Sequence, residues 1–353
     1  MKIIYGNRND GICILRCFGY DGQVELPKEI HGTFVTELGP YLFSETVRRQ
    51  EPGRLYFADL SEEEAGNGFT GENGNEQQEE REQETLRALL RADALADGTP
   101  ALKGMALRSL SLPEHLKKIG AYACYNCGNL EFLEFFGALK DLGAGLFTGC
   151  HRMARIHLHM EFGETCCLKE VLAELRQTLR VAFIDQQGTI WAKLLFPEYY
   201  EESIENTPAR ILTQEMHGCG HRYRNAFSGK EFQYWTYDKL FPHIQVQEKP
   251  ELVTELVMGR LMYPVQLKED RKRIYEEYSS THGREILRVA QKQQDMDLLK
   301  FAAASSWCSE ECLEEMLEEG GCEGNAQALG ILMDIRYQKK ENSRKKGKNR
   351  FTL

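Results

Sequence analysis

Side chains able to bind an anion or a partner gather in residues 216–224, whose sequence is MHGCGHRYR. Two glycines flank Cys219 there. A glycine-flanked turn exposes main-chain N–H groups, and neighbouring guanidinium forks suit phosphate or carboxylate. The candidate binding residues are His217, His221, Arg222 and Arg224. Their spacing matches neither the GxxxxGK[ST] phosphate loop nor the GxGxxG turn.

Two other interpretations of this segment stay open. Cys219 between two histidines has the composition of a nucleophilic site, centred on residues 198–224. The favoured interpretation is structural: the basic side chains cap helices or pair inside the molecule with the carboxylates of Glu198, Glu201, Glu202 or Glu205. We therefore predict no catalytic residue and no cofactor, and we keep an enzyme or small-ligand receptor at residues 198–224 as an alternative.

Cysteine and histidine pairs raise the question of a metal or redox site. Cys124 and Cys127 have CxxC spacing, which redox pairs and half-sites for zinc share. His157 and His159 lie on one side of an expected strand, near His151 and Cys150, but no companion ligand follows at a zinc-like spacing. We predict buried structural cysteines, solvated histidines that point away from the core, unremarkable thiols at Cys166 and Cys167, and no metal.

The composition narrows the class of protein. The chain has 353 residues and a formal net charge of −10, which argues against a nucleic-acid binder because phosphate contacts need a basic face. Its start has no basic segment followed by an apolar run, and no stretch approaches the ~18 apolar residues of a membrane span. Eleven cysteines in a chain without an export signal suit reduced thiols. We expect a cytoplasmic protein with no membrane contact.

An internal repeat of 23 residues dominates the middle of the chain. Leu110 falls on Leu133 and then on Ile156, and the same step relates further apolar positions. Alternate residues of each copy fit one face of a short strand, and an Ile-Gly or Leu-Gly pair turns the chain at a glycine whose backbone angles other residues resist. Because one coil cannot bury its inner face alone, the coils must stack. The predicted repeat core is Leu110, Leu112, Ile119, Leu133, Phe135, Leu142, Ile156 and Leu158.

The repeat resembles the BspA-type leucine-rich repeat, with its lePxxlxxIGxxAFxxCxxLxxIxL pattern. The matching copies read LSLPEHLKKIGAYACYNCGNLEFLEF and FGALKDLGAGLFTGCHRMARIHLHM, and an earlier copy lies within residues 10–45. Cys124 stands where the family usually has Phe. The resemblance covers about a quarter of the chain. It implies a bacterial protein with a parallel-strand solenoid that recognises a partner and has no chemistry of its own.

The rest of the chain is mostly helical in pattern. Residues 61–84 hold nine glutamates and one arginine, which predicts a disordered or exposed insertion. Helical spacing follows at 85–96 and 168–179, and a strand is expected at 192–196. From Glu248 on, short helices succeed one another, faintly like ankyrin-type or helical-hairpin repeats. The aromatic run at 223–241 is interpreted as a core that joins two domains.

The predicted fold class is therefore α+β: a short leucine-rich-repeat solenoid of parallel strands, a mixed middle, and an α-helical C-terminal array. The expected segments are an N-terminal repeat entry unit, an acidic insertion, the solenoid, an aromatic-rich connection, a helical region and a basic tail, at residues 1–60, 61–84, 85–197, 198–247, 248–340 and 341–353. The favoured function is a protein-interaction scaffold with an unidentified protein partner. A nucleic-acid-associated protein acting through the basic tail is a further alternative.

Overall fold

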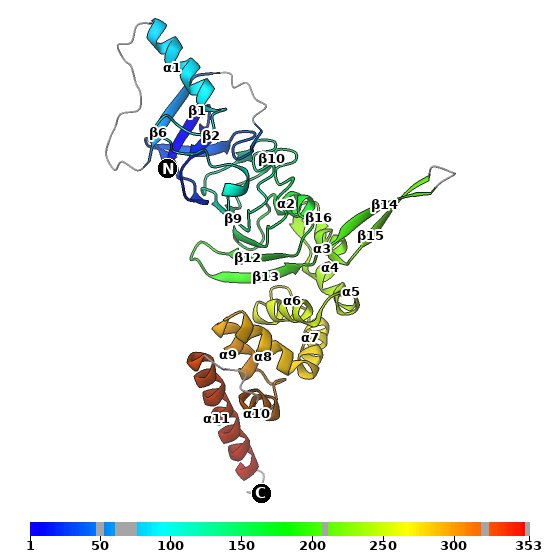
Figure 1. Ribbon diagram of the computed structural model, residues 1–353. Helices are drawn as coiled ribbons and strands as arrows, with labels where there is room; N and C mark the ends of the chain where they lie inside the picture. The colour runs from blue at the N-terminus through cyan, green and yellow to red at the C-terminus, as the bar shows by residue number, and fades with distance from the viewer. Residues whose placement is uncertain (47–52, 61–75, 207–210, 319–324, 350–353) are drawn as a thin grey trace. The chain divides into compact units, whose positions relative to one another are not determined.

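The computed structural model describes residues 1–46, 53–60, 76–206, 211–318 and 325–349, and it has the mixed α+β architecture that the sequence predicts (Figure 1). The chain divides into two compact units. Unit 1 comprises Met1–Ile190 and Glu198–Phe232, and unit 2 comprises Trp191–Pro197 and Gln233–Leu353. In the described part of the chain, no helix is long and apolar enough to cross a membrane.

Unit 1 begins with a sheet built on an antiparallel pair. Apolar runs form β1 (Lys2–Arg8) and β2 (Gly11–Phe18), and the sheet has the strand order β10-β8-β5-β2-β1-β6. The other strands are β5 (Thr33–Leu38), β6 (Leu55–Asp59), β8 (Lys118–Ile119) and β10 (Asp141–Leu142), and the short β4 (Glu29–Ile30) pairs with β5. Strands from the first expected repeat copy and from residues 110–142 thus share one sheet.

A second sheet of unit 1 holds the strands of the 23-residue repeat. Its strands that belong to unit 1 run in the order β12-β11-β9-β7-β3, and every pair among them is parallel. The strands are β3 (Gln23–Glu25), β7 (Ser109–Ser111), β9 (Phe132–Phe136), β11 (Arg155–His159) and β12 (Leu179–Ile184). In register, Leu110 lies beside Leu133 and Leu133 beside Ile156, so the sequence period is also the spacing of the ladder.

The glycines of the Ile-Gly and Leu-Gly pairs are needed for space rather than for their backbone angles. Neither Gly120 nor Gly143 has a positive φ, contrary to the expectation from the sequence. A Cβ on Gly143 would lie 2.1 Å from the main-chain nitrogen of Ala121, and one on Gly120 would lie 2.3 Å from the nitrogen of Pro40. Successive chain segments therefore approach so closely at these positions that any side chain would force them apart.

Seven of the eight predicted core residues are buried, and the exception is Leu142. Leu142 is half-buried because it belongs to β10, the edge strand of the first sheet. Its equivalent in the next copy, 23 residues on, is Thr165, so the sequence supplies no apolar side chain to cover it. The prediction of a continuous core is wrong at this position.

Two predicted segments differ in their bounds. Residues 61–75 lie outside the described residues, whereas 76–84, predicted as disordered or exposed, are the first part of helix α1 (Glu76–Leu89), none of whose residues is buried. The side-chain amide of Gln83 exchanges hydrogen bonds with both main-chain groups of Leu55, at 2.8 and 3.0 Å. The helix expected at 168–179 is shorter, as α2 (Leu168–Glu174), because residues from Leu179 on join the parallel ladder as β12.

Unit 1 ends in short elements around the predicted binding segment. A two-stranded antiparallel hairpin pairs β14 (Tyr200–Asn206) with β15 (Ile211–His217). After it come the helix α3 (Gly220–Arg224) and a second, minimal hairpin formed by β16 (Phe227–Ser228) and β17 (Glu231–Phe232).

Unit 2 combines strand β13 (Ile190–Phe196) with a succession of helices. Pro250 lies in the first turn of its helix, and Asp295 accepts a hydrogen bond from the main-chain nitrogen of Leu298, so local signals set several boundaries. The helices are α4 (Tyr234–Lys239), α5 (Phe241–Gln247), α6 (Pro250–Met262), α7 (Glu269–Thr281), α8 (Gly283–Lys292), α9 (Met296–Ala304), α10 (Glu310–Glu318) and α11 (Ala326–Asn349). The predicted basic tail at 341–353 is therefore largely part of α11, and residues 350–353 lie outside the described residues.

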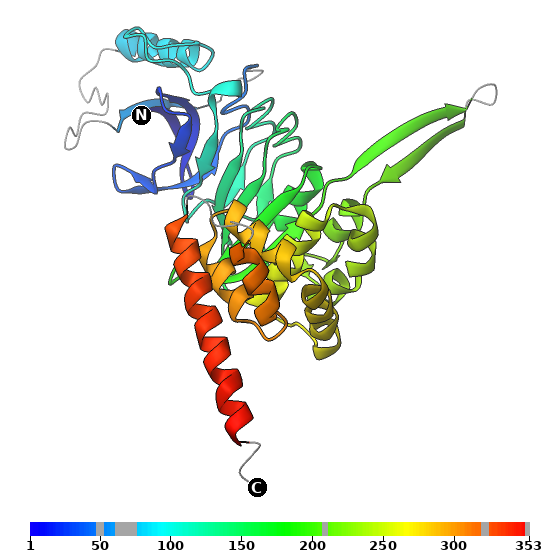
Figure 2. The ribbon, with the colours of Figure 1, turned by 60° about the horizontal axis from the view of Figure 1, so that its bottom comes forward.

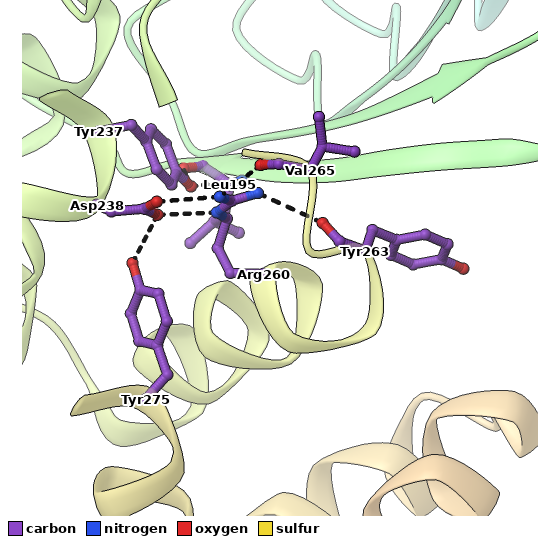
Figure 3. Close-up of polar contacts among 7 residues, drawn as sticks. All are labelled: Leu195, Tyr237, Asp238, Arg260, Tyr263, Val265 and Tyr275. Atoms are coloured by element: carbon purple, nitrogen blue, oxygen red, sulfur yellow. Dashed lines mark hydrogen bonds and ion pairs between the residues drawn. The ribbon is translucent and has the colours of Figure 1, made fainter. Parts of the chain in front are cut away.

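A buried ion pair lies among the first helices of unit 2 (Figure 3). The guanidinium of Arg260 donates two hydrogen bonds to the carboxylate of Asp238, at 2.8 and 3.0 Å, and both side chains are 1% exposed. Tyr275 donates a third bond to this carboxylate at 2.9 Å, while Arg260 also donates to the main-chain oxygen of Val265. The phenol of Tyr237 bonds both main-chain groups of Leu195 in β13 (Figure 3).

We predict that Ile119→Ala lowers the free energy of unfolding by about 2–5 kcal/mol, because Ile119 is 2% exposed and its truncation leaves a cavity. Leu142→Ala is the matched comparison, since Leu142 of β10 pairs with Ile119 of β8 in the first sheet but is half-buried. Urea denaturation followed by circular dichroism measures both. Equal losses for the two variants would contradict the edge position of Leu142.

We predict that Asp238→Asn destabilises the protein by about 3–5 kcal/mol, because it leaves the buried guanidinium of Arg260 without a counter-charge. Asp270→Asn is the control: it breaks an ion pair with Arg271 at the surface, where solvent screens it, and the midpoint of unfolding should hardly change. Thermal melts of both variants measure the two changes in stability. A small effect of Asp238→Asn would show that the carboxylate charge is dispensable.

Candidate functional site

The strands of the parallel ladder lie side by side in unit 1 (Figure 2), and on β9 and β11 one side is buried while the outer side is half-buried or exposed. Along β9 and β11, residues alternate between the core and this outer side, as the burial pattern of each strand shows. The register places Phe132 beside Arg155, Glu134 beside His157, and Phe136 beside His159. These residues are called the ladder face: Phe132, Glu134, Phe136, Arg155, His157 and His159.

Two aromatic-centred contacts organise the ladder face. The ring of His159 stacks on Phe136 with centroids 4.5 Å apart, and its Nε2 lies 2.8 Å from Oε1 of Glu134. The rings of His157 and Phe132 form a T-shaped contact with centroids 4.9 Å apart. The guanidinium of Arg155 lies 5.7 Å from the centroid of the Phe132 ring. The histidines point away from the core, but they are half-buried and packed rather than solvated as the sequence suggested.

Glu134 carries a stabilised negative charge at the centre of the ladder face. Its partial burial would raise its pKa, but hydrogen bonds from His159 and Ser111 outweigh this effect and hold the pKa below its usual value. The carboxylate is therefore ionised at neutral pH. It keeps the neighbouring imidazole in a fixed orientation, so the face is pre-organised before any partner arrives.

Hollows lie at both ends of the ladder face. One has a volume of about 680 Å³ and mixed charge, and its lining includes Asp21, Glu25, Arg108, Glu131, Phe132 and Arg155. The other has a volume of about 610 Å³ and a predominantly acidic lining that includes Glu114, Phe136, His159, Glu161, Glu164 and Asp185. Aromatic residues of the ladder face thus contribute to the wall of each hollow.

The predicted binding segment does not converge on one site. Arg224 is 4% exposed and donates to the main-chain oxygens of Leu175, Gln177 and Gly220, at 2.9, 2.6 and 3.2 Å. Burial lowers the pKa of Arg224 to about 10. These contacts support the favoured structural interpretation of Arg224 and weigh against its candidate role in anion binding, although its acceptors are main-chain carbonyls rather than carboxylates. The expected pairing with a carboxylate occurs instead at His217, with Glu202.

The other three predicted residues lie in separate surroundings. His217 ends β15, where its ring stacks on Tyr200 and its Nε2 lies 3.1 Å from a carboxylate oxygen of Glu202. His221 lies against Tyr199 and bonds with the side chain of Asn225. Arg222 is exposed on α3, and Cys219 is buried before this helix. A nucleophilic Cys219 is inconsistent with that burial, since an attacking thiolate needs access to its substrate.

The cysteines of the repeat are packed in the core. Cys124, Cys127 and Cys150 are buried, and the thiol of Cys150 donates to the main-chain oxygen of Cys124 at 3.1 Å. Burial raises the pKa of Cys150 and also raises that of Cys166, to about 11. Such thiols stay protonated and unreactive at neutral pH. Among the described residues, no three histidine, cysteine or acidic side chains group in a way that could hold a metal ion.

Sequence reasoning named two of the ladder-face residues only as candidate metal ligands, and it passed over the other four. The signal was present in the repeat itself. If Leu133 and Ile156 face the core, their neighbours on the same strands must share the opposite side. The alternation that predicts the core therefore also predicts Phe132, Glu134, Phe136 and Arg155 as one surface.

Residues 98–178 match the family model described as BspA type Leucine rich repeat region (6 copies). The matched range contains β7, β9 and β11, and the last two strands supply the ladder face. The earlier copy expected within residues 10–45 lies outside it. No curated protein and no solved structure matches the chain.

We predict that Arg224→Ala destabilises the protein by about 1–3 kcal/mol, because it leaves buried main-chain carbonyls without donors. Arg222→Ala, two residues away on the same short helix but exposed, is the control and should leave stability nearly unchanged. Chemical denaturation compares the two. If phosphate stabilised the wild type and Arg224→Ala removed only that effect, the anion-binding interpretation would return.

Proposed function

We propose that this chain, which carries a BspA-type leucine-rich-repeat region at residues 98–178, is a protein-interaction scaffold that binds its partner over the ladder face. In this proposal the parallel strands are part of a short solenoid whose stacked coils hold the face rigid. Repeat arrays commonly use such extended surfaces for recognition. The expected location is the cytoplasm.

The observation that carries the proposal is the composition of the ladder face. Two phenylalanine rings, two imidazoles, a guanidinium and a carboxylate share adjacent strands, and hollows lie at both ends. Aromatic and arginine side chains dominate the binding energy of protein interfaces, and rigid strands fix them with little loss of entropy on binding. Because Phe136 and Phe132 each wall a hollow, a partner can insert side chains beside them.

The alternatives have less support in the arrangement of side chains. A small-ligand receptor or enzyme at residues 198–224 would lose Arg224, whose donors are taken by carbonyls. A nucleic-acid-associated protein acting through the basic C-terminal residues stays open as a prediction. Its action would depend on α11 rather than on the ladder face, one of whose hollows is predominantly acidic.

The test uses immobilised full-length protein in a native lysate treated with nuclease. The variant Phe136→Ala/Arg155→Ala removes two ladder-face side chains that point away from the core. We expect the proteins captured by the wild type to bind this variant more weakly by on the order of tenfold or more, as losing an interface hot spot does. Quantitative mass spectrometry of the captured proteins gives the readout.

The matched control is Tyr200→Ala, which removes an aromatic side chain that is 60% exposed in β14, outside the ladder face. It should capture the same proteins as the wild type. Equal capture by all three proteins would contradict the ladder face as the binding surface. Capture that occurs only in a parallel sample of the lysate without nuclease would favour the nucleic-acid alternative instead.

A further inference from the structure

One thiol in unit 2 differs from the other cysteines that the structure describes. Nine of these ten cysteines are buried, and Cys312 is half-buried. It lies in the first turn of α10, where its main-chain nitrogen donates to the hydroxyl of Ser309 at 3.1 Å. Reagents in solution can therefore approach this sulfur more readily than the nine buried ones.

The surroundings of Cys312 favour a negative charge on sulfur. A Cβ built on Gly283 would lie 3.4 Å from the Cys312 sulfur, and Gly283 begins the ten-residue helix α8. The main-chain N–H groups at a helix N-terminus carry partial positive charge that stabilises a thiolate. The sulfur of Cys312 thus lies close to the N-terminus of a second helix while belonging to the first turn of its own.

A second thiol is in contact with Cys312. The sulfur of Cys308, which is 3% exposed, lies close enough to that of Cys312 for the two thiols to interact. Both residues also bond to Ser309: the thiol of Cys308 donates to its main-chain oxygen at 3.8 Å, and the main-chain nitrogen of Cys312 donates to its hydroxyl. This contact is the largest influence on the pKa of both groups: it lowers the pKa of Cys312 and raises that of Cys308. Because Cys308 is buried and Cys312 is only half-buried, Cys312 is the sulfur that a reagent from solution reaches first.

Charged groups from three helices face the pair. Arg284 of α8 favours the thiolate of Cys312, while Glu315 of α10, the ion-pair partner of Arg284, opposes it. Lys339 of α11 also favours the thiolate, and its ammonium donates to the main-chain oxygens of Ser305 and Cys308 at 2.8 and 2.6 Å. With two cations and one anion, these three side chains give the surroundings of the Cys312 sulfur a net positive charge.

We propose that Cys312 is a peroxide-reactive thiol and that Cys308 resolves its oxidation by forming a disulfide. The Cys312 thiolate attacks one oxygen of hydrogen peroxide, the O–O bond breaks, and the departing hydroxide takes up a proton to leave as water. The sulfur becomes a sulfenic acid. The sulfur of Cys308 then attacks it, and the Cys308 proton leaves with the displaced hydroxide as a second water. In sum, two thiols and one peroxide give one disulfide and two waters.

The experiment uses the full chain with Cys322→Ser, because the tryptic peptide 301–336 then contains only two cysteines, Cys308 and Cys312. In the native protein at pH 7, iodoacetamide should label Cys312 at least about tenfold faster than Cys308 or Cys166, because only the thiolate reacts. After hydrogen peroxide, this peptide should lose two hydrogens, as measured by mass spectrometry. Slow labelling of Cys312, or a peptide of unchanged mass, would overturn the proposal.

Two further variants test the separate roles of Cys308 and Cys312. In Cys308→Ser, which keeps a hydroxyl donor of similar size, peroxide should stop at a sulfenic acid on Cys312 that dimedone traps. In Cys312→Ser, Cys308 should remain reduced, because the buried thiol has no accessible partner to start the reaction. Oxidation of Cys308 in Cys312→Ser would overturn the assignment of roles. Circular dichroism confirms that each variant is folded.

Discussion

The parallel register between neighbouring strands of the ladder decides both what unit 1 buries and what it presents. Leu110, Leu133 and Ile156 meet in one row because the strands pair without a shift, and Phe132 and Arg155 meet in the next row for the same reason. A slip of one residue would exchange the two sides and place aromatic and charged groups in the core. The close approach at Gly120 and Gly143 opposes such a slip, because chain segments fit together there only where no side chain intervenes. The core, the turns at the two glycines and the ladder face therefore all depend on the parallel register.

Unit 2 is specified in a different way, by a polar network inside an apolar setting. Arg260 and Asp238 are both 1% exposed, and such a pair stabilises a fold only when every remaining donor and acceptor is used. Tyr275 and the main-chain oxygens of Tyr263 and Val265 provide further bonds of this kind, and the contact aligns α4, α6 and α7 with the chain that follows α6. Tyr237, next to Asp238 in sequence, bonds both main-chain groups of Leu195 and so ties β13 to the same helix. Geometry of this kind selects one packing of helices among the many that hydrophobic contact alone allows.

The sequence predicted most where a periodic pattern is tied to burial. The repeat period located β7, β9 and β11 of the ladder and all but one member of the predicted core, whereas β12 was missed because a helix was expected up to residue 179. Leu142 escaped because burial needs a covering strand, and the sequence position that would cover it holds Thr165. The first part of helix α1, residues 76–84, was missed because its glutamates resemble a disordered segment, whereas the amide of Gln83 fastens the helix to β6. The partners of Arg224 were predicted wrongly because they are the carbonyls of Leu175 and Gln177, main-chain groups that any residue could supply. Contacts to the main chain leave no trace in residue types, so composition cannot reveal them.

A side chain can serve a ligand only with the bonding capacity that the fold leaves to it. Arg224 has the right chemistry for an anion, but the fold uses its donors. Arg155 has the same chemistry, is exposed, and lies over the ring of Phe132 beside a hollow. The same distinction separates the thiols: that of Cys150 bonds to the main chain of Cys124 within the core, whereas Cys312 is half-buried and reachable from solution. Residue type therefore indicates the candidates, and the hydrogen-bonding capacity that each side chain keeps in the folded state selects among them. That criterion is the reason why we propose the ladder face of unit 1 as the recognition surface and Cys312 of unit 2 as the reactive thiol.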